Sequence, residues 1–166
     1  MSFFLPQNKQ ELLNFPVVAV RDGVVFPKTE NVLVFGRKKS VATINEALAR
    51  EKKLVLVLQK NPGDEDPTKD SLHSIGVLAS IEKTVIGEKG EVNAMIKGIQ
   101  KVRIQEYVRE VPYFEAKVEL LTESGEANEE VNAMVKYISQ QMKRAINLGK
   151  AVDFVFLMNI LNVATP

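Results

Sequence analysis

The chain has 166 residues, and its 22 basic and 21 acidic side chains leave a formal net charge of +1, which provides no general field to attract nucleic acid. Because 45% of the residues are hydrophobic and 26% are charged, the chain can bury a real core. It contains no cysteine and a single histidine, His73, which excludes disulfides, thiolate metal sites, cysteine nucleophiles and zinc-binding histidine pairs.

Residues 1–15 are expected to form a tail. They include apolar residues at positions 3–5, and Pro6 then interrupts any helix. The segment lacks the basic start and long apolar stretch of a secretion signal, and it is not rich in arginine like a mitochondrial presequence. No run in the sequence approaches the roughly 20 apolar residues of a membrane helix. These features favour a cytoplasmic protein.

Three short apolar runs follow and predict three strands. They are Pro16–Val20, Val24–Phe26 and Val32–Phe35. An Asp-Gly pair after Arg21 suits a bend between the first two runs, and Pro27 ends the second. Gly36 breaks the third run before a helix, for which Ser40 is the expected N-cap.

The predicted helix keeps its apolar residues at helical spacing. Those residues are Val41, Ile44, Ala47 and Leu48. Lys52 and Lys53 are expected in the last turn, where cations suit the helix dipole. The next run, Leu54–Gln59, is apolar on both faces, so it predicts a strand covered on both sides, with the helix as a candidate cover.

The middle of the chain predicts a surface loop and then a series of strands. The polar residues 60–76 form the loop, in which Asp66 and Pro67 are expected to start one short helical turn. Strands are expected at 75–86, 91–98, 99–108 and 113–121. In the second of these, even-numbered residues are expected inside and odd-numbered residues outside. A hairpin turn is expected at 87–90, and Gly98 marks a bulge or corner.

Polar and acidic residues from Thr122 onward predict a linker into a helix. From Glu129, apolar residues keep helical spacing, and Gly149 is a suitable stop. Asp153 is expected to cap a second helix that is almost wholly apolar. An apolar terminal helix needs a cover, so we expect a piece of a longer polypeptide. The alternative is a helix that docks back on the body.

The pattern as a whole predicts an α+β fold. Many strands and hairpins in one body indicate a β-barrel or curled sheets with one inserted helix, followed by a helical appendage. Three parts are expected: a tail at 1–15, a β-rich domain at 16–121 and the start of a helical subdomain at 122–166.

Four sequence blocks stand out in order along the β-rich part of the chain. The first combines Pro16 with Arg-Asp at 21–22, Phe-Pro at 26–27 and Gly-Arg at 36–37. The second is "LVLVLQKNPGDEDPTKDSLHSIGVLA", and the last two are "KGIQKVRI" and "PYFEAKVE". In this order they resemble the N-terminal domain of Lon, the ATP-dependent protease: its opening block, its buried strand with a Gln-Lys pair and acidic loop, its glycine corner and its last β-strand.

The resemblance implies a PUA-like barrel followed by a helical unit. It also implies that the region helps to recognise unfolded or tagged protein substrates and supports assembly of a hexamer. In full-length family members the ATPase, with ATP and Mg²⁺, and the Ser-Lys protease site lie further along the chain. No Gly-x-x-x-x-Gly-Lys-Ser/Thr phosphate loop occurs in this sequence. We therefore expect a non-catalytic chain without a cofactor of its own.

Other candidate groups favour structural roles. Arg21 and Asp22 could form an anion site or a catalytic pair, but such a pair at a strand end more often locks a turn. The acidic residues 64–66 lack the alternating spacing of a calcium loop, so a solvated loop is expected. His73 has no evident orienting partner, which favours a surface or half-buried position over a catalytic one.

A basic stripe near Gly98 keeps nucleic acid open as an alternative. Lys97, Lys101 and Arg103 form this stripe, and RNA-binding domains share the architecture. The stripe has no interleaved aromatic residues for base stacking, which favours a solvated sheet face. The competing function is a stand-alone PUA-like binding module for RNA or a small ligand.

Apolar residues outside the expected core predict a polypeptide-binding surface. They are Phe26, Pro27, Val32 and Pro62 at loop edges and Met95 on the polar face of its strand. Exposed apolar patches mark polypeptide contacts, and flexible methionine is common in promiscuous ones. The alternative is that these residues belong to the core or its rim. The expected partners are unfolded or damaged proteins and further copies in a homohexamer, with no membrane and at most weak nucleic-acid binding.

Overall fold

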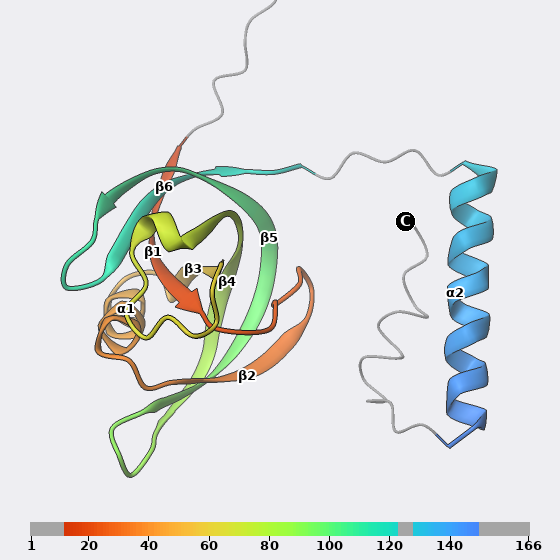
Figure 1. The fold of residues 1–166 in the computed structure, drawn as a ribbon, viewed down its shortest axis with the longest axis horizontal. Coiled ribbons are helices and arrows are strands. Elements are labelled where there is room, and N and C mark those ends of the chain that lie inside the picture. Colours follow the sequence, from red (N-terminus) through yellow and green to blue (C-terminus); the bar gives the residue numbers. More distant parts are fainter. Residues whose placement is uncertain (1–11, 123–127, 150–166) are drawn as a thin grey trace, which may run out of the picture. The chain divides into compact units, whose positions relative to one another are not determined.

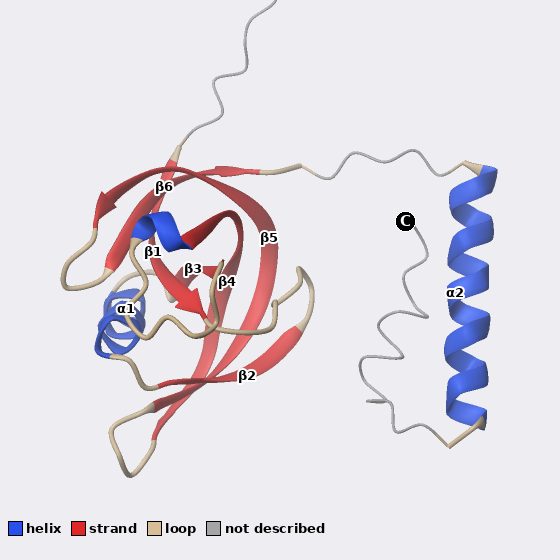
Figure 2. Ribbon diagram, in the orientation of Figure 1, coloured by secondary structure: helices blue, strands red, loops and turns tan. Residues whose placement is uncertain are grey.

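The computed structural model describes residues 12–122 and 128–149. The chain divides into two compact units, Met1–Thr122 and Glu123–Pro166, and each is described by itself. The described part of the first unit contains the strands and helix α1, and that of the second unit contains helix α2 (Figure 1, Figure 2). Within these two stretches, no helix is both long and apolar enough to cross a membrane.

The first unit is a six-stranded sheet with one inserted α-helix. Its elements are β1 (Leu13–Val20), β2 (Glu30–Phe35), α1 (Lys38–Ala49), β3 (Lys53–Gln59), a short 3₁₀ helix (Lys69–Ser71), β4 (Leu72–Ile86), β5 (Val92–Arg109) and β6 (Phe114–Leu120). The strand order is β2-β5-β4-β3-β1-β6, and a further pairing of β5 with β6 closes five of the strands into a ring. β1 runs parallel to β3, and the other pairs are antiparallel. The predicted α+β class with a barrel-like body is confirmed.

The long strand β5 serves two neighbours on the same edge. Its residues 92–97 pair with β2, and its residues 102–109 pair with β6. Opposite β4, the register passes from Leu78–Gln100 to Ala79–Gly98, which leaves Ile99 as an extra residue. A bulge of this kind bends a strand and increases its twist. The predicted bulge at Gly98 is therefore confirmed, and it lies between the two halves of β5.

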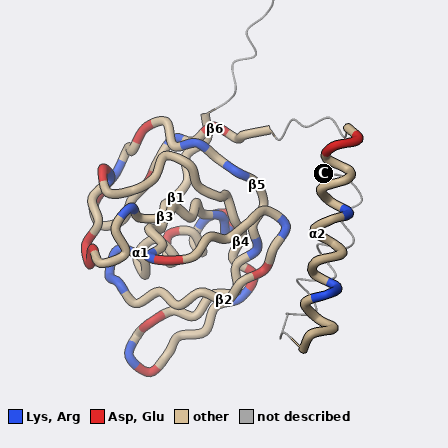
Figure 3. Tube along the Cα trace, turned by 45° about the vertical axis from the view of Figure 1, so that its right-hand side comes forward, with Lys and Arg blue, Asp and Glu red and all other residues tan. Residues whose placement is uncertain are grey.

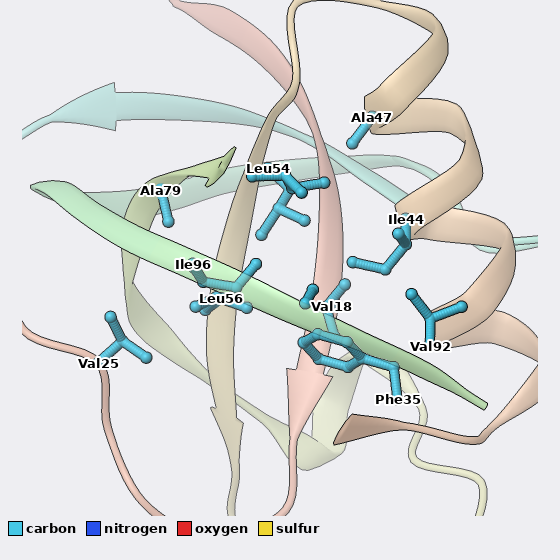
Figure 4. Packing of buried hydrophobic residues seen from close by; sticks show 12 residues of the cluster. Val18, Val25, Phe35, Ile44, Ala47, Leu54, Leu56, Ala79, Val92 and Ile96 are labelled. Atoms are coloured by element: carbon cyan, nitrogen blue, oxygen red, sulfur yellow. The ribbon is translucent and has the colours of Figure 1, made fainter. Parts of the chain in front are cut away.

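Two hydrophobic clusters lie on the opposite faces of β3. Leu54 and Leu56 belong to one cluster, which also contains Ile44 of α1 (Figure 4). Val55 and Val57 belong to the second cluster, which β1, β4, β5 and β6 complete. The four β3 residues are at most 5% exposed. The prediction of a strand covered on both sides, with the helix on one of them, is confirmed.

The predicted strand Val24–Phe26 is wrong. These residues lie in the loop between β1 and β2, where Gly23 (φ 79°) and Lys28 (φ 66°) turn the chain. Val25 is 5% exposed although no strand pairs with its segment. Val25 is therefore apolar because it packs in the core. A short apolar run in the sequence cannot show whether its residues are buried in a loop or in a paired strand.

The start of α1 also differs from the prediction. The helix begins at Lys38, and Arg37 occupies the N-cap without a side-chain hydrogen bond. Ser40, the expected N-cap, lies inside the helix and is 6% exposed. The helix starts earlier because β2 ends at Phe35, and only Gly36 and the N-cap Arg37 connect it to the helix.

The end of α1 and the start of β1 shift as well. The helix ends at Ala49, so the two expected basic residues follow it: Lys52 turns the chain with φ 58°, and Lys53 begins β3. β1 begins at Leu13, earlier than the expected Pro16, because residues 13–17 pair with β6. A pairing with so distant a segment leaves no local trace in the sequence.

The described part of the second unit is one helix. α2 spans Glu129–Asn147, close to the predicted start and stop. The side chain of Asn128 caps it by accepting the backbone N–H of Val131 at 2.8 Å. The helix predicted from Asp153 lies outside the described residues.

Candidate functional site

The loop between β1 and β2 is anchored on β5 at Gly98. The Lys28 N–H donates to the Gly98 carbonyl, and the Gly98 N–H donates to the Thr29 carbonyl, both at 2.9 Å. A Cβ at residue 98 would lie 2.1 Å from the Phe26 carbonyl oxygen, so only glycine permits this approach. The anchored loop holds Phe26 with 62% of its surface exposed.

Phe26 and Pro27 line a mainly apolar pocket of about 340 Å³. Its other walls include Leu56 and Leu58 of β3 and Ile75 of β4. The polar side chains at the pocket come from His73, Ser74 and Lys101. His73 is exposed on β4, in agreement with the prediction. The pocket is suited to an apolar side chain and holds no carboxylate that could orient the histidine.

Val32 and Met95 lie directly opposite each other on β2 and β5. Val34 pairs with Asn93, which in turn pairs with Val85 of β4. Because register partners point to the same face of a sheet, these apolar side chains lie together on its solvent side. We call Val32, Val34, Val85 and Met95 the outer patch; their exposed fractions are 65%, 65%, 67% and 37%.

The outer patch contains two residues that the sequence analysis missed. In β2 apolar residues occupy both faces, since Leu33 and Phe35 turn inward while Val32 and Val34 are exposed. Period-two alternation therefore could not show which pair is exposed. The available signal for an exposed apolar residue was that β2 has apolar residues on both of its faces. The expected exposure of Met95 could then have identified the exposed face of β2 as the one that carries Val32, its cross-strand neighbour.

The residues of the predicted polypeptide-binding surface lie in three places. Val32 and Met95 belong to the outer patch, and Phe26 and Pro27 belong to the pocket beside the β1–β2 loop. Pro62 is exposed in the loop after β3 and lines neither the pocket nor the patch. The structure thus brings the residues together in pairs, and the loop residues that bond to Gly98, Lys28 and Thr29, lie between Pro27 and Val32 along the chain.

A groove of about 980 Å³ runs between β1 and β2. Residues 17–22 and 32–37 line it in unbroken succession. The first turn of α1 and residues 65–67 also contribute to its walls. The sequence analysis missed this groove because strands that are neighbours in sequence are separated here: β2 pairs with β5, and β1 pairs with β3 and β6.

The acidic loop is tied to the body by ion pairs. Glu65 accepts from Arg21 at 2.9 Å, and Asp66 lies 2.9 Å from the ammonium group of Lys39. Arg21 thus has a structural role, as expected, and its partner is Glu65, because the loop after β3 lies against the end of β1. Among the described residues, no three metal-ligating side chains are grouped to hold an ion.

The basic stripe is largely neutralised. Lys97 lies 3.5 Å from Glu30, and Arg103 lies 3.5 Å from Glu119. Lys101 instead lines the pocket that contains Phe26. Acidic and basic residues are interspersed over the first unit (Figure 3). The arrangement gives no continuous positive surface along this stripe.

Glu115 forms a buried ionic cluster with a structural role. It is 7% exposed and accepts from Arg50 at 2.6 Å and from Arg109 at 3.3 Å, which joins the end of α1 to β5 and β6. The hydrogen bond to Glu115 is the main cause of the raised pKa of Arg50. Nearby on β5, burial raises the pKa of Tyr107 to about 12, and its hydroxyl has no hydrogen-bond partner among the described residues.

The fold is shared with two solved structures. The N-terminal domain of Lon protease from the Mycobacterium avium complex matches with a TM-score of 0.68 and 19% identity, over 89% of this chain and 74% of that one. The Lon N-terminal domain protein from Xanthomonas campestris matches with a TM-score of 0.59 and 14% identity, over 78% and 73%.

Sequence relatives and a family model point the same way. Lon protease of Geobacter metallireducens is 30% identical over 97% of this chain, and that of Dictyoglomus thermophilum is 29% identical over 91%. The chain spans 20% and 19% of the length of these relatives. The model of the ATP-dependent protease La (LON) substrate-binding domain matches residues 14–165. The resemblance seen in the sequence is confirmed, and the chain belongs to the family of LON substrate-binding domains.

Proposed function

We propose that this chain binds unfolded or tagged polypeptides for a Lon-type ATP-dependent protease. The outer patch is the observation that carries the proposal. Four apolar side chains are exposed there on three adjacent strands, beyond what the core needs. Contiguous exposed apolar surface is typical of contacts with other polypeptides. Unfolded clients expose the apolar segments that folded proteins bury, so such a surface can select them by state and not by sequence.

The pocket beside the β1–β2 loop provides a second proposed contact. Phe26 presents an exposed ring beside an apolar cavity of about 340 Å³, which suits one side chain of a client. Met95 adds a flexible thioether side chain to the outer patch, which adapts to differently shaped partners. Pro62, which lies apart from both contacts, stays a prediction from the sequence alone.

Catalysis is proposed to belong to other parts of a longer protein. The chain spans about one fifth of the length of its Lon relatives. ATP, Mg²⁺ and a Ser-Lys protease site would act in the remainder, with six copies assembled in the cytoplasm. Weak binding by each copy would then suffice, because linked sites add through their effective concentration.

A small-ligand module is the second candidate. The pocket volume falls within the range of roughly 300–1,000 Å³ found for ligand sites, which is the observation in its favour. RNA binding has less support because carboxylates neutralise two of the three residues in the basic stripe.

The test is an NMR titration of the chain with a reduced, unfolded client and with the same client folded. We expect a Kd on the order of 10 µM to 1 mM for the unfolded form, equivalent to roughly 4 to 7 kcal/mol. Shifts should map to the outer patch and to the loop around Phe26. The double variant Val32→Ser, Met95→Ser should weaken binding, whereas Val111→Ser, a change at a residue that is 76% exposed elsewhere, should not. No shifts, or equal effects of both variants, would show that the patch does not bind clients.

A further inference from the structure

β2 has an unpaired edge that borders the groove. It is the terminal strand in the sheet order, and it pairs on one side only, with β5. On the far wall, β1 loses its β6 neighbour after Val17, so residues 18–20 pair only with β3. Among the described residues, no further hydrogen bond reaches the backbone of 18–20 or 31–35.

The residues that line the groove show that strand edges form its walls. A strand that presents a face to a cavity contributes every second residue, because successive side chains point to opposite faces. Here residues 17–22 and 32–37 contribute without a gap. The groove is therefore bordered by the backbone groups of two strands, on opposite sides.

The edge of β2 lacks the usual protection against pairing. Natural proteins cover such edges or blunt them with lysine, proline or bulges. β2 reads Glu-Asn-Val-Leu-Val-Phe, without lysine or proline, and its register with β5 is regular. Its two outward valines are each 65% exposed. An open, apolar edge of this kind is suited to accept another strand.

We propose that the groove binds one extended segment of a non-native polypeptide by strand addition. The proposal rests on the proposed function and deepens it by naming how the client is held. Main-chain hydrogen bonds to β2 and β1 would fix the segment, and its alternate side chains would reach the outer patch through Val32 and Val34. A partner strand matching the six residues of β2 spans roughly 20 Å.

The geometry favours a free segment over a second copy of this chain. A segment within the groove needs both of its own edges unpaired. The β2 of another copy has one edge bonded to its own β5 and could offer only one. Among the charged residues of the groove, Arg21 and Lys39 are paired with Glu65 and Asp66, and the remaining Asp22, Arg37 and Lys38 leave a balance of only one positive charge (2 − 1), so the groove favours no strongly charged segment. Recognition would therefore depend on an extended backbone.

Backbone methylation of a peptide tests the proposal without changing the protein. The parent is a capped peptide of about seven residues with alternating apolar and polar side chains. Two derivatives carry N-methyl groups on the apolar or on the polar residues, which removes the N–H donors toward one wall while keeping every side chain. Each derivative should bind the full chain at least tenfold more weakly than the parent, and the parent should slow amide exchange in residues 31–35.

The outcomes separate this proposal from the proposed function. If the parent and an unfolded client both fail to bind, the proposed function fails. If both bind, but a methylated peptide binds as tightly as the parent, strand addition is wrong and side-chain contacts suffice. Protection of residues 31–35 in the free protein that rises with its concentration would assign the groove to self-association, which also overturns the proposal.

Discussion

Replacing Gly98 by alanine should detach the β1–β2 loop from the barrel. The added Cβ would stand 2.1 Å from the Phe26 carbonyl oxygen and 3.2 Å from the Pro27 Cα. Ordinary contact begins at 3.4 Å, so the carbonyl must retreat by about 1.3 Å (3.4 − 2.1). Both backbone hydrogen bonds at Gly98 would lengthen or break.

The expected loss of stability is about 1 to 6 kcal/mol. Two backbone hydrogen bonds contribute roughly 0.5 to 1.5 kcal/mol each, and forcing a methyl group into a packed site costs about 1 to 3 kcal/mol. A smaller unfolded-state entropy offsets roughly 0.4 to 1 kcal/mol of this loss. Because the φ of Gly98 is not positive, backbone strain adds nothing.

Urea unfolding followed by circular dichroism measures the effect, with Gly36→Ala as the matched control. A Cβ at Gly36 would meet only the Cβ of Glu91, at 4.0 Å, so this variant should unfold within about 0.5 kcal/mol of the parent. Amide exchange at Lys28 reports the anchor directly and should accelerate in Gly98→Ala alone. Equal stabilities of the two variants, or an unchanged Lys28 amide, would refute the reasoning from this contact.

Three further predictions concern buried or terminal polar groups. Tyr107→Phe should stabilise the first unit by about 1 kcal/mol in urea, because it removes a buried hydroxyl without a partner among the described residues. Burial raises the pKa of Tyr107 to about 12, from about 10 in the unfolded chain. The free energy of unfolding therefore contains a contribution from the protonated hydroxyl that is full below pH 10 and is lost as the pH rises toward 12. The variant should lack this part of the alkaline decline, and identical pH profiles would contradict the assignment. Glu115→Gln should cost about 2 to 3 kcal/mol because it removes the buried carboxylate that Arg50 and Arg109 share and leaves Arg50 with Glu46 alone among the described carboxylates, whereas Glu119→Gln, with an ion pair of 3.5 Å at the surface, should cost less than about 1 kcal/mol. Asn128→Ala should destabilise α2 by about 1 kcal/mol, seen as lost helical circular dichroism, and a fully retained signal on heating would argue against the cap.

Patterns that depend on burial could be read from the sequence. Residues 54–57 are apolar without interruption, which only a strand covered on both faces explains, and the structure shows that arrangement. Gly98 could be identified as a corner because a glycine inside an alternating strand weakens it unless geometry requires it. The segment Val24–Phe26 was misread because core burial in a loop produces the same short apolar run as a strand.

The candidate site was only partly predictable. Met95 could be found because one apolar residue stood on a polar face, and Val32 was named for its position at a loop edge, but only the pairing of β2 with β5 shows that the two lie opposite each other. Val85 was missed because the sequence does not show that the end of β4 extends past the core, where Val85 is exposed. The groove could not be found at all, since it results from β2 pairing with β5 while β1 pairs elsewhere.

The closure of the ring sets a condition on how the first unit folds. The first and last strands are partners, with Leu13 opposite Val118, a separation of 105 residues (118 − 13). To form contacts so distant in sequence, the chain must first lose the entropy of closing a long loop, and only then does it gain the energy of the contacts. Such contacts therefore slow folding. During synthesis, β1 can pair with β3 early but must wait for β6 to leave the ribosome. Until then β1 presents a second open edge, so a nascent chain that stalls before residue 114 would itself expose the kind of unpaired strand that a polypeptide-binding protein captures.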